Sequence, residues 1–161
     1  MTYTDRVRNT RSWCLGLLAL VGCGGGGGDG GSNVMISDQP LSGVIGGQPW
    51  TFGSGETDAF LSSADSLFVN LYPGTVTPCS FDAPTDANLV TMQVPTAPGS
   101  YPLSLQRNVT LYVASTSFNN VATRGLLVID SVTATTVSGG LNTTYDGSNH
   151  VDGQFQATIC P

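Results

Sequence analysis

The chain has 161 residues, and its 11 acidic side chains outnumber its five basic ones, which are all arginines. Its formal net charge is −6 at pH 7, and only 10% of its residues are charged, against roughly 25% in an average soluble domain. Because no basic patch is present to neutralise phosphate groups, this composition excludes nucleic-acid binding, and the acidic surface also repels anionic lipid headgroups.

The first 22 residues have the organisation of a secretory signal peptide. Three arginines, Arg6, Arg8 and Arg11, precede an apolar run over residues 13–22 that ends in small residues. This run is too short to cross a bilayer as a helix, which takes roughly 20 apolar residues. The pattern therefore predicts export and cleavage.

The end of this segment, Leu20-Val21-Gly22-Cys23, resembles the lipobox of bacterial lipoproteins at every position. The resemblance implies cleavage before Cys23, diacylation of the Cys23 thiol and acylation of the new amino group, with palmitate among the chains. Two or more acyl chains hold a protein on a membrane, since each buried CH2 contributes about 0.8 kcal/mol. Gly24 stands where an aspartate retains enterobacterial lipoproteins in the inner membrane, so the resemblance implies the outer membrane.

Two other interpretations of this N-terminal part remain open, and a third fails. An ordinary signal peptide would contain Cys23 by chance, and an uncleaved membrane anchor would need a longer apolar run. The glycines of residues 24–32 could form a phosphate-binding loop, but no Gly-Lys-Ser/Thr follows them and no strand precedes them.

Residues 24–32 are glycine apart from Asp29 and Ser32, and such a stretch cannot bury apolar surface. We expect a flexible tether, in which ten residues span about 17 Å root-mean-square. The predicted organisation is a signal peptide over residues 1–22, a lipidated cysteine with its linker over residues 23–40, and a folded domain over residues 41–161.

From residue 41 onward, apolar and polar residues alternate with the period of a β-strand. Turn signals every 8–12 residues predict an all-β fold, a β-sandwich of about eight or nine short, mostly antiparallel strands, with a small barrel as the runner-up. A short helical turn would fit only around residues 57–63, and residues 115–120 are expected to be a polar break. The expected strands lie in residues 41–46, 50–52, 67–72, 89–94, 101–105, 109–114, 125–130, 132–144 and 151–159.

Two of these strands carry more specific expectations. Residues 125–130 are apolar in both phases, which predicts a central strand covered on both faces. Residues 151–159 alternate strictly after the turn cluster 145–149, which predicts a C-terminal hairpin with one face in water. This hairpin resembles the closing hairpin of uncharacterised bacterial lipoproteins, which often end in a Val-x-Gly-x-Phe-x-Ala-x-x-Cys pattern, and the resemblance implies architecture only.

The chain contains four cysteines, and the lipoprotein resemblance removes Cys14 with the signal peptide and uses Cys23 for lipid. Cys79 and Cys160 then remain as a pair in an oxidising compartment, so we expect a disulfide between them. Cys160 falls on the outward phase of the last strand, and the bridge should therefore form at the end of the sheet. Two free thiols are the alternative.

Few residues of the sequence are candidates for a catalytic or metal-binding site. The single histidine, His150, has no nucleophile motif or second metal-binding partner at a useful spacing, so we expect no catalytic site and no cofactor. Asp146, Asn149 and Asp152 could supply calcium ligands, although they do not match the register of a calcium loop, and turn formation also explains them.

These patterns predict a lipid-anchored bacterial envelope protein that acts as a non-catalytic binding or structural module. Its membrane contact would be the lipid, and a protein or glycan partner is unspecified. The first alternative is a calcium-stabilised adhesin-like or carbohydrate-binding domain, in which exposed aromatic residues would stack on sugars. The second is a secreted hydrolase built around His150. The aromatic candidates are Trp50, Phe52, Tyr72, Tyr112 and Tyr145.

Overall fold

The computed structural model describes residues 34–80 and 84–161, and it is nearly all β-structure. The one helical element in these two stretches is a single 3-10 turn, η1 (Ala114–Thr116). The strands are β1 (Ser42–Ile45), β2 (Gln48–Thr51), β3 (Ser54–Asp58), β4 (Ser66–Tyr72), β5 (Leu89–Pro95), β6 (Gly99–Pro102), β7 (Val109–Val113), β8 (Phe118–Ala122), β9 (Gly125–Val132), β10 (Thr136–Asp146) and β11 (Asn149–Thr158).

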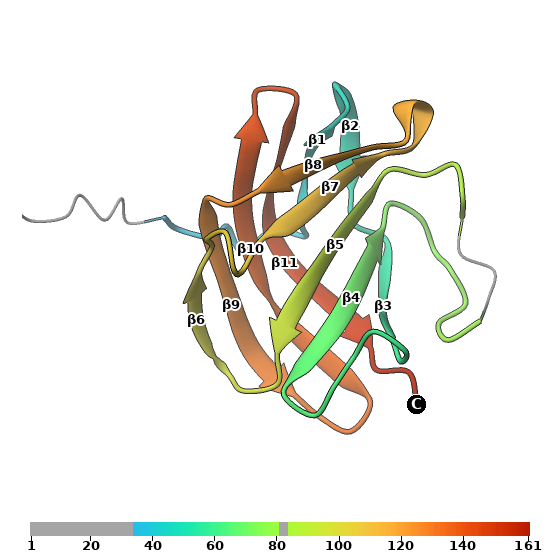
Figure 1. The fold of residues 1–161 in the computed structure, drawn as a ribbon, viewed down its shortest axis with the longest axis vertical. Helices are drawn as coiled ribbons and strands as arrows, with labels where there is room; N and C mark the ends of the chain where they lie inside the picture. Colours follow the sequence, from blue (N-terminus) through green and yellow to red (C-terminus); the bar gives the residue numbers. More distant parts are fainter. Residues whose placement is uncertain (1–33, 81–83) are drawn as a thin grey trace, which may run out of the picture. The chain divides into compact units, whose positions relative to one another are not determined.

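All the strands belong to one continuous sheet, which curls into a half-barrel around the core (Figure 1). Its main path runs β6-β9-β10-β11-β3-β4-β5-β7-β8, and β1 and β2 branch from β11. Neighbouring strands are antiparallel except for β11 and β3. The predicted all-β class with short, mostly antiparallel strands is confirmed, and the curled sheet agrees with the two predicted architectures, a sandwich or a small barrel.

Strand β11 is the centre of this arrangement. One of its edges pairs with β10 along the predicted hairpin. Its other edge is shared, because β1 pairs with the beginning of β11 and β3 meets its end, where Thr158 lies opposite Glu56. Between these two contacts the chain passes very close to Gly153, where a Cβ atom would come within 2.5 Å of the Gln39 carbonyl oxygen. A glycine is therefore required at this point of the sequence pattern.

The core lies on the concave side of the curled sheet and is built from the alternate residues of each strand. In β4, for example, Leu67, Val69 and Leu71 are buried, and the residues between them point outward. Other members of the core include Leu41, Ile45, Trp50, Val90, Val94, Leu111, Leu127, Ile129, Val137, Leu141 and Phe155.

Several predicted strands are confirmed, among them β4, β5, β7 and both strands of the hairpin. The predicted helical turn around residues 57–63 is absent, because β3 continues to Asp58 and the chain then turns. The Asp58 carboxylate stabilises that turn by accepting hydrogen bonds from the Phe60 and Leu61 N–H groups at 2.8 and 3.1 Å. β6 begins and ends earlier than the predicted strand over residues 101–105.

Two expectations about coverage and boundaries were wrong. Residues 115–120 do not form a simple polar break, because η1 leads directly into β8, where the inward-facing Asn120 donates to the Leu111 carbonyl oxygen. β9 is not covered on both faces, since Leu127 is fully buried while Leu126 and Val128 remain partly exposed.

The sheet also holds part of the predicted linker. The Asn142 side chain donates to the Met35 carbonyl oxygen at 2.9 Å, and the Ser37 N–H donates to an Asp152 carboxylate oxygen at 3.1 Å. The Gln154 side chain donates in turn to the Ser37 carbonyl oxygen. Contacts with the sheet thus begin at residue 35, earlier than the predicted domain start at residue 41.

Candidate functional site

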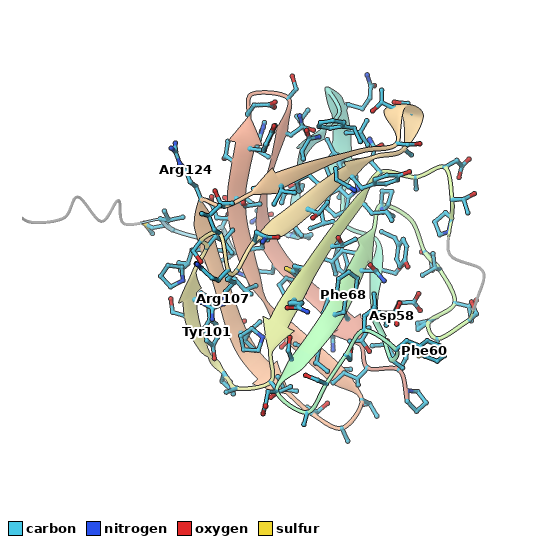
Figure 2. The ribbon with its side chains drawn as sticks, viewed as in Figure 1. Asp58, Phe60, Phe68, Tyr101, Arg107 and Arg124 are labelled. Atoms are coloured by element: carbon cyan, nitrogen blue, oxygen red, sulfur yellow. A yellow bond between two sulfur atoms is a disulfide. The ribbon has the colours of Figure 1, made fainter. Side chains whose placement is uncertain are left out.

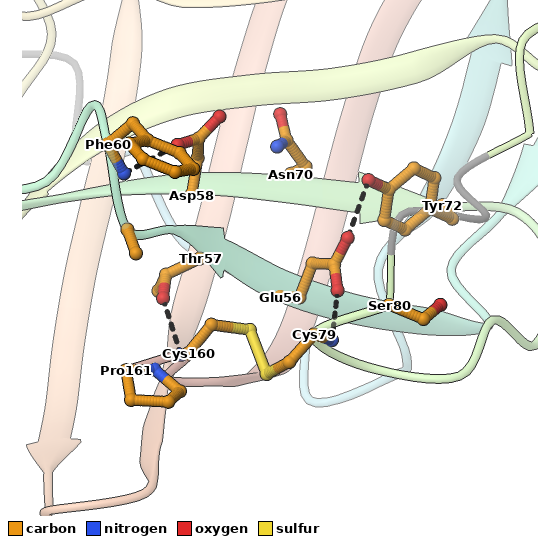
Figure 3. Close-up of a pocket in the computed structure, with 11 residues that line it drawn as sticks. Glu56, Thr57, Asp58, Phe60, Asn70, Tyr72, Cys79, Ser80, Cys160 and Pro161 are labelled. Atoms are coloured by element: carbon orange, nitrogen blue, oxygen red, sulfur yellow. Dashed lines mark hydrogen bonds between the residues drawn. A yellow bond between two sulfur atoms is a disulfide. The ribbon is translucent and has the colours of Figure 1, made fainter.

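A cavity of about 340 Å³ lies on the outer side of β3 and β4, beside the end of β11 (Figure 3). Outward-facing residues of the two strands, the segment around Cys79 and the residues after β11 form its walls. This volume falls at the lower end of the range of 300–1,000 Å³ that is common for small-molecule sites. The cavity is therefore the candidate site of the domain.

Glu56, the one glutamate of the chain, is buried in a wall of this cavity although its strand directs it away from the core. Glu56 is only 8% exposed to solvent. Oε1 accepts a hydrogen bond from the Tyr72 hydroxyl at 3.1 Å, and Oε2 accepts one from the Cys79 N–H at 2.6 Å. A buried carboxylate is costly unless hydrogen bonds or charges compensate it, so these two bonds stabilise the wall.

The same arrangement affects Tyr72. Its burial, and then the charge of the Glu56 carboxylate that accepts its hydrogen bond, raises the pKa of Tyr72 far above the ordinary value of 10.0. The phenol therefore stays protonated at any physiological pH and continues to donate to Glu56. Tyr72 is a structural donor at this site.

A disulfide between Cys79 and Cys160 closes one side of the cavity, with a Cα–Cα distance of 5.4 Å. It ties the segment after β4 to the residue that follows β11 by two positions. The Thr57 hydroxyl oxygen accepts the Cys160 N–H at 2.9 Å, so the end of the chain is also held to β3. The predicted disulfide, and its position at the end of the sheet, are confirmed.

A carboxylate oxygen of Glu56 and the two cysteine sulfurs lie within 4.8 Å of one another. Such a cluster would suit a soft metal ion only if the sulfurs were thiolates. Both sulfurs are joined in the disulfide, so they carry no thiolate charge and the cluster does not form a metal site in this state.

The lining of the cavity also includes Asp58, Phe60 and Asn70. Figure 3 shows the Asp58 carboxylate and the Asn70 amide projecting to the same side of the strands, with the Phe60 ring beside them. Phe60 is 89% exposed, which is unusual for a large apolar side chain. Polar acceptors next to an exposed ring can orient a small ligand, which is the chemistry this site offers.

In the sequence, Tyr72 stands out only as a possible stacking aromatic, and no motif marks Glu56, Asp58 or Phe60. Residues 57–63 looked like a helical turn, which concealed the outward alternation of Glu56 and Asp58 in β3. The expected disulfide was the available signal, because it brings Cys79 to the end of β11. The disulfide alone could not locate the site, because β11 contacts β3 through one parallel pair, Thr158 with Glu56, and no sequence pattern predicts that pair.

The three residues predicted as calcium ligands are not gathered at one point. Asp146 accepts hydrogen bonds from the Ser148 N–H and the Asn149 side chain, at 2.8 and 2.9 Å. Asn149 faces inward, and Asp152 lies further along β11 on the outward face, where it binds the Ser37 N–H. Calcium binding stays a prediction, and a calcium-dependent rise in melting temperature would test it.

Asn149 also has a structural role that makes a prediction. Its side-chain oxygen accepts from the Gly46 N–H at 2.8 Å and from the buried Asn120 amide at 3.1 Å. Asn149→Ala leaves both donors without this acceptor, so we expect the free energy of unfolding to fall by about 2 kcal/mol in urea denaturation. Asn119→Ala, at an exposed position of β8, is the matched control and should change it by less than about 0.5 kcal/mol.

The other candidates are dispersed over the domain. His150 lies on β11, opposite Val44 and Thr144, because this strand begins two residues before the predicted strand over residues 151–159. Trp50 is buried and its indole donates to the Asn88 carbonyl oxygen at 2.9 Å, so its ring is not a stacking surface. Tyr145 is about half exposed at the tip of the hairpin.

The signal peptide, Cys23 and the glycine-rich stretch lie outside the described residues. In the part of the chain that the structure describes, no helix is long and apolar enough to cross a membrane. No protein-family model, curated protein or solved structure matches this chain.

Proposed function

We propose that this chain is a lipid-anchored protein of a bacterial envelope, held by acyl chains on Cys23 and sorted to the outer membrane. The observation that carries the proposal is the complete lipobox, Leu20-Val21-Gly22-Cys23, directly after a short apolar run. The Cys79–Cys160 disulfide supports it, because structural disulfides persist in oxidising compartments such as the periplasm and the cell surface.

The domain beyond the tether is proposed to act as a non-catalytic binding or structural module. The cavity beside β3 supports a binding role, because it combines a volume of about 340 Å³ with several polar groups in its lining. Its one buried acidic group, Glu56, is already engaged by Tyr72 and Cys79, and the single histidine lies elsewhere, on β11. This arrangement favours binding over hydrolysis.

Lipidation can be tested with one substitution and one matched control. In a bacterial host fed with an alkyne analogue of palmitate, the full chain should acquire the label and sediment with membranes. Cys23→Ser should abolish labelling, because the acceptor thiol is gone, whereas Cys14→Ser should leave it unchanged. Label retained on the Cys23→Ser protein would overturn the proposal.

The membrane of residence gives a second test. Gly24→Asp introduces the residue that retains enterobacterial lipoproteins in the inner membrane. The labelled protein should therefore move from the dense outer-membrane fraction to the lighter inner-membrane fraction. Gly24→Ser is the control and should not move. An unchanged distribution of the Gly24→Asp protein would argue against sorting by this residue.

A further inference from the structure

Two polar side chains in the cavity lining, Asp58 and Asn70, have atoms that form no hydrogen bond with the described residues. Asp58 uses Oδ1 to bind the N–H groups of the turn that follows β3, and its other oxygen, Oδ2, has no partner among the described residues. The Asn70 side chain likewise has none within residues 34–80 and 84–161. Both groups lie in the cavity lining, so it presents acceptors ready for a donor.

The charge around these acceptors has one sign. Glu56 and Asp58 are the ionisable acids of the lining, and both point outward from β3 two positions apart. The two arginines of the described part, Arg107 and Arg124, lie far from Asp58 and Phe60 (Figure 2). Arg107 instead lies over the Tyr101 ring, 5.0 Å from its centroid. The cavity therefore attracts a positive group and repels an anion.

Strand register places a further acceptor in the lining, on the side away from Asp58. Asn70 of β4 lies directly opposite Glu56 of β3, and Tyr72 follows two residues later on the same face. The Tyr72 hydroxyl donates a hydrogen bond to Glu56, and the lone pairs of its oxygen can still accept one. Asp58 lies opposite Phe68, four residues from Tyr72 along β4, so the Asp58 and Asn70 oxygens are neighbours in the lining while the Tyr72 oxygen lies beside Glu56.

We propose that this cavity binds the primary ammonium group of a small organic amine. An ammonium group has three N–H donors and no acceptor, so it can donate to the free oxygen of Asp58 and to the neighbouring Asn70 oxygen while its third N–H faces water. The exposed Phe60 ring beside Asp58 adds a cation–π contact and packs on the alkyl part of the amine. This inference builds on the proposed binding role of the domain and is independent of the lipid anchor.

Other ligands fit these groups less well. A calcium ion prefers several carboxylate oxygens, but N–H or O–H donors already engage both oxygens of Glu56 and one oxygen of Asp58. An anion would meet Glu56 and Asp58 and no basic side chain of the lining. A neutral alcohol could use the acceptors but would gain nothing from the two carboxylate charges. The ammonium group uses the charge, the acceptors and the ring together.

Calorimetric titration of the full chain, extracted from membranes in a non-ionic detergent, tests the proposal with three probes of equal length. These are 1,4-diaminobutane, 1,4-butanediol and succinate. The diamine should bind at least tenfold more tightly than the diol, and succinate should give no binding heat. Equal affinity for diamine and diol, or no diamine binding at all, would overturn the proposal.

Substitutions then locate the binding. Asp58→Asn keeps the Oδ1 acceptor that the turn needs and removes the charge, and it should weaken diamine binding at least tenfold. Asp130→Asn, an exposed position on β9, removes the same charge elsewhere and should change the affinity less than twofold. If both variants lose affinity equally, the diamine is associating with the acidic surface in general and the proposal is wrong.

Two more variants separate binding from folding. Glu56→Gln can accept the Cys79 N–H with its oxygen and donate to the Tyr72 hydroxyl with its amide, so the wall is kept while the charge is lost. Phe60→Ala alters a side chain that is 89% exposed and should leave the melting temperature unchanged while weakening the diamine about threefold. Full diamine affinity in both variants would overturn the assignment of this cavity. Since lipid labelling is measured separately, a failure here leaves the anchor proposal untouched.

Discussion

Replacing both Cys79 and Cys160 with serine is expected to lower the free energy of unfolding by about 2–4 kcal/mol. The bridge joins residues that are 81 positions apart. In the chain-entropy model, cross-linking a loop of this length lowers the entropy of the unfolded chain and stabilises the folded state by at most about 4.5 kcal/mol. Urea denaturation followed by fluorescence measures the change, and the melting temperature should fall by roughly 10 °C.

The reductant provides the control for this experiment. A phosphine reductant should destabilise the original protein to a similar extent and should have no effect on the double serine variant. A melting temperature that is the same with and without reductant in the original protein would mean that the bridge adds no stability. A fall in both proteins would mean that the reductant acts elsewhere.

Leu127→Ala should cost about 2–5 kcal/mol of unfolding free energy, because this fully buried side chain of β9 leaves a cavity in the core. Leu126→Ala changes the same residue type one position away, on the partly exposed face of the strand, and should cost about 1 kcal/mol or less. Urea denaturation of the two variants under identical conditions measures the difference.

Leu126→Ala and Leu127→Ala together test whether β9 has one buried face or two. Equal and large losses for Leu126→Ala and Leu127→Ala would indicate that both faces of β9 are covered, as the run of apolar residues predicted. A large loss for Leu127 alone agrees with a strand that has one buried face. Val128→Ala, on the same face as Leu126, is a further control and should also be mild.

Period-2 alternation predicted the strands that have an apolar inward face and clear turns at their ends, such as β4 and the β10–β11 hairpin. In these strands side-chain burial follows residue parity, so the sequence carries the structural information directly. The cysteine pairing was predictable as well, because the resemblance to a lipoprotein signal peptide accounted for Cys14 and Cys23 and left two cysteines to pair.

The features that the sequence did not predict depend on contacts with residues far away in the chain, which local sequence patterns do not reveal. Asn120 breaks the apolar alternation of β8, yet it faces inward because it binds the Leu111 carbonyl oxygen and the Asn149 side chain. The apolar residues of β9 gave no signal that one face would stay partly exposed. The cavity escaped prediction because it depends on where the segment after β4 crosses the outer side of β3.

The place of β11 in the middle of the sheet has a consequence for the order of events during synthesis. Glu56 of β3 is made about 100 residues before its partner Thr158, which corresponds to roughly 5–20 s of translation. Throughout that interval β3 has an open edge, β1 has no partner except β2, and Cys79 remains a free thiol. Unpaired edges of this kind are where β-proteins aggregate. A nascent chain of this protein therefore has a period of vulnerability that ends only when β11 is inserted, and factors that shield exposed strands should matter most to its yield.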